Sequence, residues 1–351
     1  MLLLSASCGL LLASAAAPVV VVAVAMMLLL SASCDQNGGD AGWGWSYSHG
    51  GKALHFAGPD QWSRLPGSSR CGHGAPTERQ APVSITTSKA AYNPAFAALE
   101  FDYDWPSISG LTVVNDGVSL IAMLADSGAA TNTHTDKATL SGGPFEAGAR
   151  FVLREARFHW GSNAGSSGSE HAIDGQFAEA EVHLVHYSDR FASSIEAQAS
   201  PRGLAVVAVF IRVGDAPNAA FDRLLGSSTI AALAEAGAAV SVPGVSLAEW
   251  LPASTEQYFH YPGSLTAPPC YESVRWVVMR EPITISQEQL DRLRSVRVAG
   301  SAGLADIASI DRDEQHTKAG LKASSTKARG YSIKSIPDDE TLRWPFALPA
   351  D

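Results

Sequence analysis

The sequence is poor in charged residues, in basic residues and in cysteine, and each shortage excludes a class of protein. Charged side chains make up 17% of the 351 residues and hydrophobic ones 46%, which excludes a disordered chain. The 35 aspartates and glutamates outnumber the 25 lysines and arginines, so no basic face for nucleic acid is expected. The four cysteines show neither a CxxC pair nor zinc-finger spacing, which excludes a small disulfide scaffold. An acidic globular protein remains.

The N-terminal segment has no charge at all, because the first charged residue is Asp35. An apolar run of this length is typical of a secretory signal or of a membrane span. Residues 1–33 therefore predict either a signal peptide cleaved before Cys34 or a retained signal anchor. We expect a secreted or otherwise exported protein, with membrane anchoring by this segment as the alternative. Residues 34–42 are rich in glycine and are interpreted as a linker.

The pattern of hydrophobic residues predicts a mainly β (α+β) fold in one domain, over residues 43–350. We expect strands at 111–124, 150–160, 177–186, 204–213 and 274–279. Short peripheral helices are expected at 221–239 and 286–297, the second with Ser286 as its N-cap. A shift toward Gly, Ala, Ser and charged residues predicts a surface insertion at about 299–337.

Two of the predicted strands carry a row of polar side chains. Alternation places Glu155, Arg157 and His159 on one face of the first strand. Glu181 and His183 share a face of the second strand in the same way. Two such strands predict a convergent site, and the alternative interpretation is a pair of structural histidines in the core.

The sequence also resembles the α-carbonic anhydrases, through motifs that follow one another in order. These motifs are WGWSYSHGG, GPDQW, ERQAPVSI, FHWGS, GSEH, FAEAEVHLVHY, GLAVVAVFIRVG and YPGSLTAPPCYESVRW. The resemblance implies the fold of that family, a large, mostly antiparallel twisted sheet with a conical pocket. It also implies the family reaction, the zinc-dependent hydration of CO2 to bicarbonate.

The resemblance places the family's zinc ligands on residues that only partly suit a metal. Three histidines hold the zinc in that family, and the second and third correspond to His159 and His183. The first corresponds to Arg157, as in the carbonic-anhydrase-related proteins. A guanidinium only donates hydrogen bonds, and a unit charge about 4 Å from a divalent ion costs about 8 kcal/mol at an effective dielectric constant near 20. We therefore expect zinc binding to be weakened or lost, with His171 as an alternative third ligand.

Further site residues are assigned by the same resemblance. Thr266 and Glu170 match the pair that orients the zinc-bound hydroxide, whereas Val118 replaces the histidine that shuttles protons. Glu181 matches the acceptor that holds a ligand histidine, and His171 matches a structural histidine beside it.

The resemblance also assigns residues that orient a ligand, line the pocket or form a disulfide in the family. Glu155 stands where the family has a glutamine that orients the first ligand, and it is expected to pair with Arg157. Four residues match the hydrophobic wall against which CO2 rests in the family: Val185, Val206, Leu265 and Trp276. The alternative interpretation is that these four side chains are simply part of the core. Cys71 and Cys270 match the pair that forms a disulfide in secreted members of the family, and two reduced thiols are the alternative.

Two functions follow from these expectations. The first is an exported protein with the α-carbonic anhydrase fold, in which CO2 hydration is lost or impaired and a protein partner takes the place of a substrate. The second is an active zinc carbonic anhydrase that acts on CO2 and bicarbonate. Arg157 and Val118 favour the first function, and the Thr266–Glu170 pair favours the second.

Overall fold

The computed structural model describes residues 44–45, 56–57, 67–71, 79–103, 110–124, 138–161, 168–296 and 331–332. The predicted signal segment 1–33, the linker 34–42 and most of the insertion expected at 299–337 lie outside these residues. Among the helices of the described ranges, none has the length and apolar character needed to cross a membrane.

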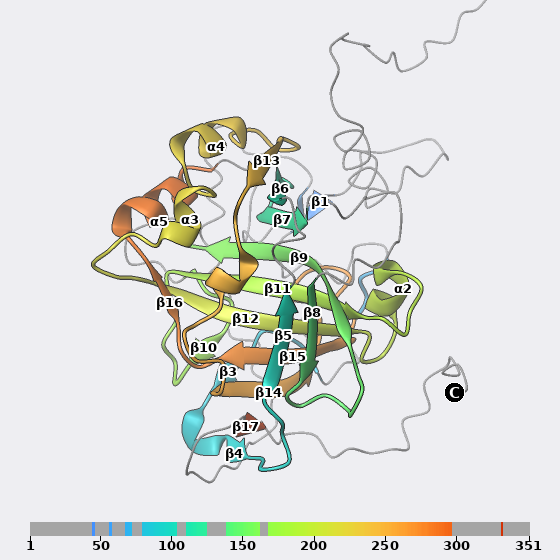
Figure 1. The fold of residues 1–351 in the computed structure, drawn as a ribbon. Helices are drawn as coiled ribbons and strands as arrows, with labels where there is room; N and C mark the ends of the chain where they lie inside the picture. The colour runs from blue at the N-terminus through green and yellow to red at the C-terminus, as the bar shows by residue number, and fades with distance from the viewer. Residues whose placement is uncertain are drawn as a thin grey trace, which may run out of the picture.

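One large twisted sheet forms the centre of the fold, which confirms the predicted mainly β architecture (Figure 1). Its strands follow the order β13–β6–β7–β9–β11–β12–β15–β14–β17–β4, with β16 beside β12 and with β5 joined through β8 to β9. Most neighbours are antiparallel, whereas β12–β15, β12–β16 and β14–β17 are parallel. The strands of this sheet are β4 (Ala91–Tyr92), β5 (Leu99–Tyr103), β6 (Gly110–Asn115), β7 (Leu120–Leu124), β8 (Ala138–Gly142), β9 (Phe151–Trp160), β11 (Ala180–Ser188), β12 (Leu204–Val213), β13 (Ala239–Pro243), β14 (Tyr258–Gly263), β15 (Val274–Met279), β16 (Ile283–Ile285) and β17 (Tyr331–Ser332).

Short elements surround this sheet. Two small parallel pairs join β1 (Gly44–Trp45) to β2 (Phe56–Ala57) and β3 (Ser84–Ile85) to β10 (Ala172–Ile173). The helices α3 (Ala219–Asp222), α4 (Ser227–Ala232) and α5 (Gln287–Arg294) gather at one side of the sheet, and α2 (Ser194–Ala199) lies at the other side (Figure 1). The described helices are thus short and peripheral, as predicted.

The central strands β9, β11 and β12 separate two groups of buried side chains. Phe158, Val182 and Val207 belong to the larger hydrophobic cluster on one face. Val206 and Ala208 belong to a second cluster on the opposite face, toward which the polar residues of β9 and β11 point. Because neighbouring residues of a strand face opposite ways, this alternation places the polar row against the smaller cluster.

The elements read most reliably from sequence are those with a continuous apolar run or a clear cap. Strands β12 and β15 span the predicted ranges 204–213 and 274–279. Helix α5 begins after Ser286, whose side chain accepts the N–H of Gln289, while the Gln289 side chain accepts the N–H of Ser286. This reciprocal capping satisfies two donors at the start of the helix and confirms Ser286 as the N-cap.

The single strand predicted over 111–124 is wrong, because the chain forms a hairpin of β6 and β7 there. The turn is stabilised by Asp116, whose Oδ1 accepts the N–H groups of Val118 and Ser119 at 2.9 and 2.6 Å. Gly117 adopts φ 88°, a conformation that glycine reaches without strain. Asp116 and Gly117 are consecutive residues of types that favour turns, so the sequence did contain an indication of this turn.

The continuous helix predicted over 221–239 is also wrong. The chain forms α3 and α4 with a break between them, and β13 begins at Ala239. Gly226 has an extended backbone directly before α4, and Gly237 has φ 82° two residues before the start of β13. Glycine weakens a helix interior, so two glycines divide the apolar pattern into short elements.

Candidate active site

Strands β9 and β11 bring their polar residues together, as the alternating pattern predicted. Arg157 lies opposite His183 in the antiparallel register, and His159 lies opposite Glu181. The imidazole rings of His159 and His183 have their centroids 4.5 Å apart, and both side chains are buried. Two histidines on neighbouring strands therefore converge on one buried point.

Glu170 places its carboxylate at the same point from the segment that follows β9. Its Oε1 lies 3.1 Å from His159 Nδ1, and its Oε2 lies 3.7 Å from His183 Nδ1. The backbone before it passes very close to its neighbours, since a Cβ on Gly168 would lie 2.0 Å from the Glu179 carbonyl oxygen. Glycine at this position lets the segment approach β11 closely enough to deliver Glu170.

Glu181 is the most heavily hydrogen-bonded carboxylate of the site. Its Oε2 accepts the backbone N–H groups of Glu170 and His171 at 2.8 and 2.9 Å. Its Oε1 lies 2.6 Å from His171 Nδ1 and 2.7 Å from His183 Nε2. Burial raises the pKa of Glu181, but the neighbouring His171 and His183 outweigh it and hold that pKa well below its usual value. Glu181 therefore orients two imidazoles at once.

His171 has both ring nitrogens engaged. Nδ1 contacts Glu181, and Nε2 lies 2.6 Å from the hydroxyl of Tyr261. Burial together with the charges of Glu181 and Glu170 raises the pKa of Tyr261 well above its usual value, so its hydroxyl stays protonated. A structural role for His171 agrees with these contacts, whereas service as a substitute metal ligand would require breaking one of them. Tyr261 was not identified in the sequence, although it opens the YPGSLTAPPC motif.

Arg157 turns its guanidinium toward two carboxylates. Nη1 lies 2.8 Å from Asp116 Oδ2, and Nη2 and Nε lie 3.4 Å from Glu155 Oε1. The expected Glu155–Arg157 contact is therefore present, and Arg154 Nε adds a second cation 3.3 Å from Glu155 Oε2. Burial raises the pKa of Glu155, but Arg154 and Arg157 hold it below its usual value.

Asp116 is a second site residue, after Tyr261, that could not be identified from the sequence alone. It belongs to the turn between β6 and β7, and β7 pairs with β9 at Ile121 and Arg157. This pairing brings the turn alongside the arginine. Its sequence signal was the NDG turn motif two residues before Val118, but only the pairing of β7 with β9 shows which cation Asp116 meets.

The remaining predicted site residues lie in the same region, with roles that stay predictions. Val118 is half-buried in the turn that carries Asp116. Thr266 is half-buried in the loop after β14, and its contact with Glu170 stays a prediction. The four predicted wall residues pack within or against the smaller hydrophobic cluster: Val185, Val206, Leu265 and Trp276. The rings of Trp276 and His183 also form a T-shaped contact, with their centroids 4.9 Å apart.

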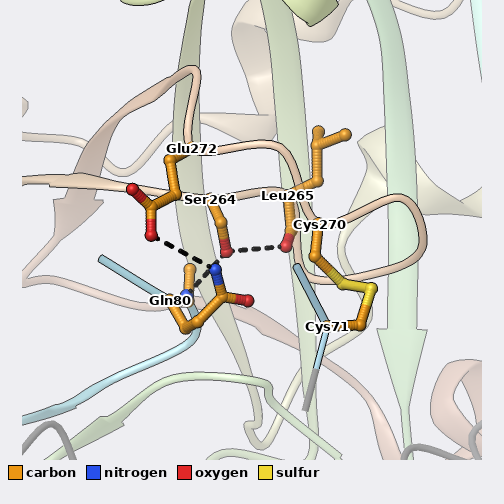
Figure 2. The surroundings of a disulfide bond; sticks show 7 residues. Cys71, Gln80, Ser264, Leu265, Cys270 and Glu272 are labelled. Atoms are coloured by element: carbon orange, nitrogen blue, oxygen red, sulfur yellow. Dashed lines mark hydrogen bonds between the residues drawn. A yellow bond between two sulfur atoms is a disulfide. The ribbon is translucent and has the colours of Figure 1, made fainter. Parts of the chain in front are cut away.

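A disulfide between Cys71 and Cys270 anchors the loop that carries Thr266 and Leu265 (Figure 2). The two Cα atoms are 5.3 Å apart, which confirms the predicted pairing. Figure 2 shows hydrogen bonds around it, including one from Gln80 Nε2 to Glu272 Oε1. These links fasten the segment before β3 to the rim of the site.

Comparisons with known proteins agree with the geometry. Residues 57–318 match the family model for eukaryotic-type carbonic anhydrase. The chain is 37% identical over 240 residues to carbonic anhydrase 7 of Mus musculus, which covers 68% of this chain and 83% of that relative. It is 36% identical over 259 residues to carbonic anhydrase 7 of Homo sapiens, which covers 74% of this chain and 87% of that relative. With its sheet, its buried histidines and these likenesses, the chain belongs to the carbonic anhydrase family.

Proposed function

We propose that this chain is an exported protein with the carbonic anhydrase fold in which zinc-dependent hydration of CO2 is lost or impaired. The reason is that Arg157 stands where the family has a histidine ligand. One observation carries this proposal, namely that the Arg157 guanidinium lies against the carboxylates of Asp116 and Glu155.

The zinc ion that the family implies requires three histidines, and the residues of this chain do not supply that set. His159 and His183 offer two imidazoles, but a guanidinium has five N–H donors and no lone pair for a metal. Arg157 is also held by charge-assisted contacts with Asp116 and Glu155. The three-histidine zinc site of the family therefore does not fit this pocket.

Rearrangement of Arg157 to make room for a ligand would be costly. Removing one partner of a fully buried ion pair typically costs about 3–5 kcal/mol, and the cost is smaller here because the Arg157 guanidinium is partly exposed. Glu155 is buried, and turning Arg157 outward would leave it with Arg154 as its cationic neighbour. The pair thus supports a pocket adapted to the arginine.

Val118 supports the same proposal, because it stands at the position where the family has a histidine that transfers protons. An isopropyl group cannot accept or donate a proton, so any proton released in this pocket must pass to water or buffer. The residue lies in the same turn as Asp116, beside Arg157. Two positions that the family uses for catalysis are thus altered close together.

Export is proposed from the uncharged residues 1–33 and from the disulfide, since disulfides persist mainly in oxidising compartments. Anchoring by the same segment is the alternative. The acidic composition does not favour nucleic acid as a partner. In an inactive protein, we propose that a protein partner is the ligand.

The alternative function is an active carbonic anhydrase that hydrates CO2. The observation that favours it is the preserved group of Glu170, Glu181, His159 and His183, together with the apolar wall. The relatives named carbonic anhydrase 7 also favour it, because they match most of the length of this chain.

The first test compares CO2 hydration by the unaltered chain with that by Arg157→His, measured by stopped-flow with a pH indicator in the presence of zinc. We expect the unaltered chain to stay near the background rate and Arg157→His to exceed it about tenfold or more, because a third imidazole completes the ligand set. Glu155→Gln is added in a second variant, since that carboxylate would lose its partner.

The matched control is Arg212→His, which makes the same exchange at an exposed arginine near the end of β12. It should leave the rate unchanged. Hydration by the unaltered chain well above background would overturn the proposed function and establish the active alternative.

A further inference from the structure

Strand β9 contains one residue more than the stretch of β11 with which it pairs, and that residue is an arginine. Val185 of β11 lies opposite Glu155 in the register. The next residue of β11, His186, lies opposite Leu153, so Arg154 is left without a partner on that strand. Such a β-bulge bends the strand and re-aims the side chain of its extra residue. The Arg154 side chain accordingly reaches the Glu155 carboxylate, with Nε 3.3 Å from Oε2.

Arg154 and Arg157 contact the same carboxylate through its two oxygens. Arg154 lies at Oε2 of Glu155, and Arg157 lies 3.4 Å from Oε1. We infer that these two arginines form a binding site for a small carboxylic acid with an apolar chain. This inference rests on the proposed function only in that Arg157 is not a metal ligand.

The contacts of Arg154 leave part of its donor capacity unused. Charge-assisted hydrogen bonds between a guanidinium and a carboxylate are about 2.7–2.9 Å long, whereas Arg154 Nε lies 3.3 Å from Glu155. Arg154 Nη1 also donates to Gln198 Oε1 of α2 at 3.1 Å. Among the residues that the structure describes, Nη2 of Arg154 meets no acceptor, and this side chain is 34% exposed. An external carboxylate therefore reaches Arg154 without displacing Glu155.

The charges around Glu155 are divided unequally between the two arginines. Asp116 forms its ion pair with Arg157, whereas Glu155 is shared by both arginines. Within the described part of the chain, Arg154 is thus compensated only through this shared carboxylate. The exposed side of Arg154 therefore attracts an anion. Because water screens a charge that is partly exposed, this attraction is modest, and a ligand gains from a second, apolar contact.

Apolar side chains lie on the same face as the two arginines. Val185 is the register partner of Glu155, and side chains of such a pair lie next to each other on one face of a sheet. Val185 and Leu265 are only partly buried, and both pack against the cluster that contains Val206 and Trp276. An apolar chain that covers Val185 removes its remaining exposed surface from water, which favours binding. A carboxylate with an apolar chain matches both contacts, whereas bicarbonate and phosphate match only the first.

The test titrates hexanoate into the full chain by calorimetry, after metals have been removed with a chelator so that the anion cannot bind to a metal. We expect one hexanoate per chain. Acetate has the same carboxylate without the apolar chain, and it should bind about tenfold more weakly or worse. Hexylamine carries a positive charge instead, and it should not bind. Acetate binding as tight as that of hexanoate, or binding of hexylamine, would overturn the proposed class of ligand.

Arg154→Gln removes the charge and the unused donors of the bulge residue. The affinity for hexanoate should fall about tenfold or more, because a charge-assisted contact is lost. The matched control is Arg190→Gln, the same exchange at an exposed arginine after β11, and it should leave the affinity unchanged. Retained affinity in Arg154→Gln, or an equal loss in the control, would overturn the inference. Near-ultraviolet circular dichroism checks that each variant is folded.

A measurement on the unaltered chain decides the matter if Arg154→Gln fails to fold. Nitrogen-15 spectra of labelled arginines should show that hexanoate shifts the Nε signal of Arg154 and leaves that of Arg190 in place. Absence of binding, or binding without a shift at Arg154, overturns the carboxylate site and leaves the proposed function intact. Rapid CO2 hydration by the unaltered chain would instead contradict the proposed function.

Discussion

The two ends of the polar row on β9 and β11 are built in different ways. At one end, Glu181 holds His171 and His183 through contacts of 2.6 and 2.7 Å, with no measurable exposure of its side chain. At the other end, Arg157 is 23% exposed and is shared between Asp116 at 2.8 Å and Glu155 at 3.4 Å. The first end is a closed network of buried hydrogen bonds, and the second is an ion cluster around a partly exposed arginine.

This difference indicates which part of the pocket can change without loss of the fold. A closed network depends on each of its members, because removing one leaves buried donors or acceptors unsatisfied. The ion cluster tolerates exchange better, because water reaches the partly exposed Arg157 guanidinium and can solvate it when a partner is removed. Arg157, which we propose stands in place of a ligand histidine, therefore lies at the tolerant end, while Glu181 and the histidines that it orients lie at the sensitive end.

The largest expected effect lies at the Glu181 end. Glu181→Gln removes a buried charge that orients His171 and His183, so the free energy of unfolding should fall by about 3 kcal/mol or more. Urea denaturation at neutral pH measures this change. Glu100→Gln serves as the exposed control and should change the free energy by less than about 0.5 kcal/mol. A loss in Glu181→Gln as small as that of the control would contradict the comparison.

The same variant should respond to pH in a predictable direction. The pKa of Glu181 in the folded protein lies well below the ordinary value of 4.5, because His171 and His183 outweigh the effect of burial. Its stabilising contribution is therefore complete above about pH 4.5 and is lost as the pH falls toward the folded pKa. The difference between the unaltered chain and Glu181→Gln should narrow below about pH 4.5. If the difference in unfolding free energy between the two proteins instead grows below about pH 4.5, the pKa of Glu181 is raised in the folded protein and the prediction is wrong.

A smaller effect is expected at Asp116. Asp116→Asn keeps an oxygen for the N–H groups of Val118 and Ser119 but removes the charge that faces Arg157. We expect the free energy of unfolding to fall by about 1 kcal/mol, since the ion pair is partly open to solvent. Urea denaturation measures this loss, and the dependence of the unfolding free energy on urea concentration should stay the same as in the unaltered chain. A loss as large as that of Glu181→Gln would mean that both ends are equally sensitive.

The smallest effect is expected at Glu155. Its contacts with Arg157 are 3.4 Å long, compared with 2.8 Å for Asp116, so Glu155→Gln should destabilise the protein by about 0.5 kcal/mol. The double variant with Asp116→Asn then measures the coupling between the two carboxylates. If Glu155→Gln proves more damaging than Asp116→Asn, Glu155 is the principal partner of Arg157.

The sequence was sufficient for the parts of the fold that depend on local patterns. Strand β12 was predicted from a continuous apolar run, and α5 from the cap at Ser286. The row of Glu155, Arg157 and His159 followed from alternation alone. The hairpin of β6 and β7 was missed because its two strands are both apolar, so that the turn interrupts one long hydrophobic stretch only briefly.

Contacts between distant segments were beyond the reach of such patterns. Asp116 and Arg157 are 41 positions apart, and they meet only because β7 pairs with β9. The position of Glu170 against His159 and His183 likewise depends on how its segment lies against β11. The alternation of polar and apolar residues along a strand predicts which face a side chain lies on. The order of the strands in the sheet determines which residues that side chain contacts.

The disulfide has a consequence for what proteolysis can do to this protein. Cys71 and Cys270 are 199 positions apart, and the chain between them contains every strand from β3 to β14. A single backbone cleavage anywhere in that stretch leaves two fragments that remain joined through sulfur. His159, His183, Glu170 and Arg157 would all stay in one covalent molecule, and the cut would become visible only after reduction.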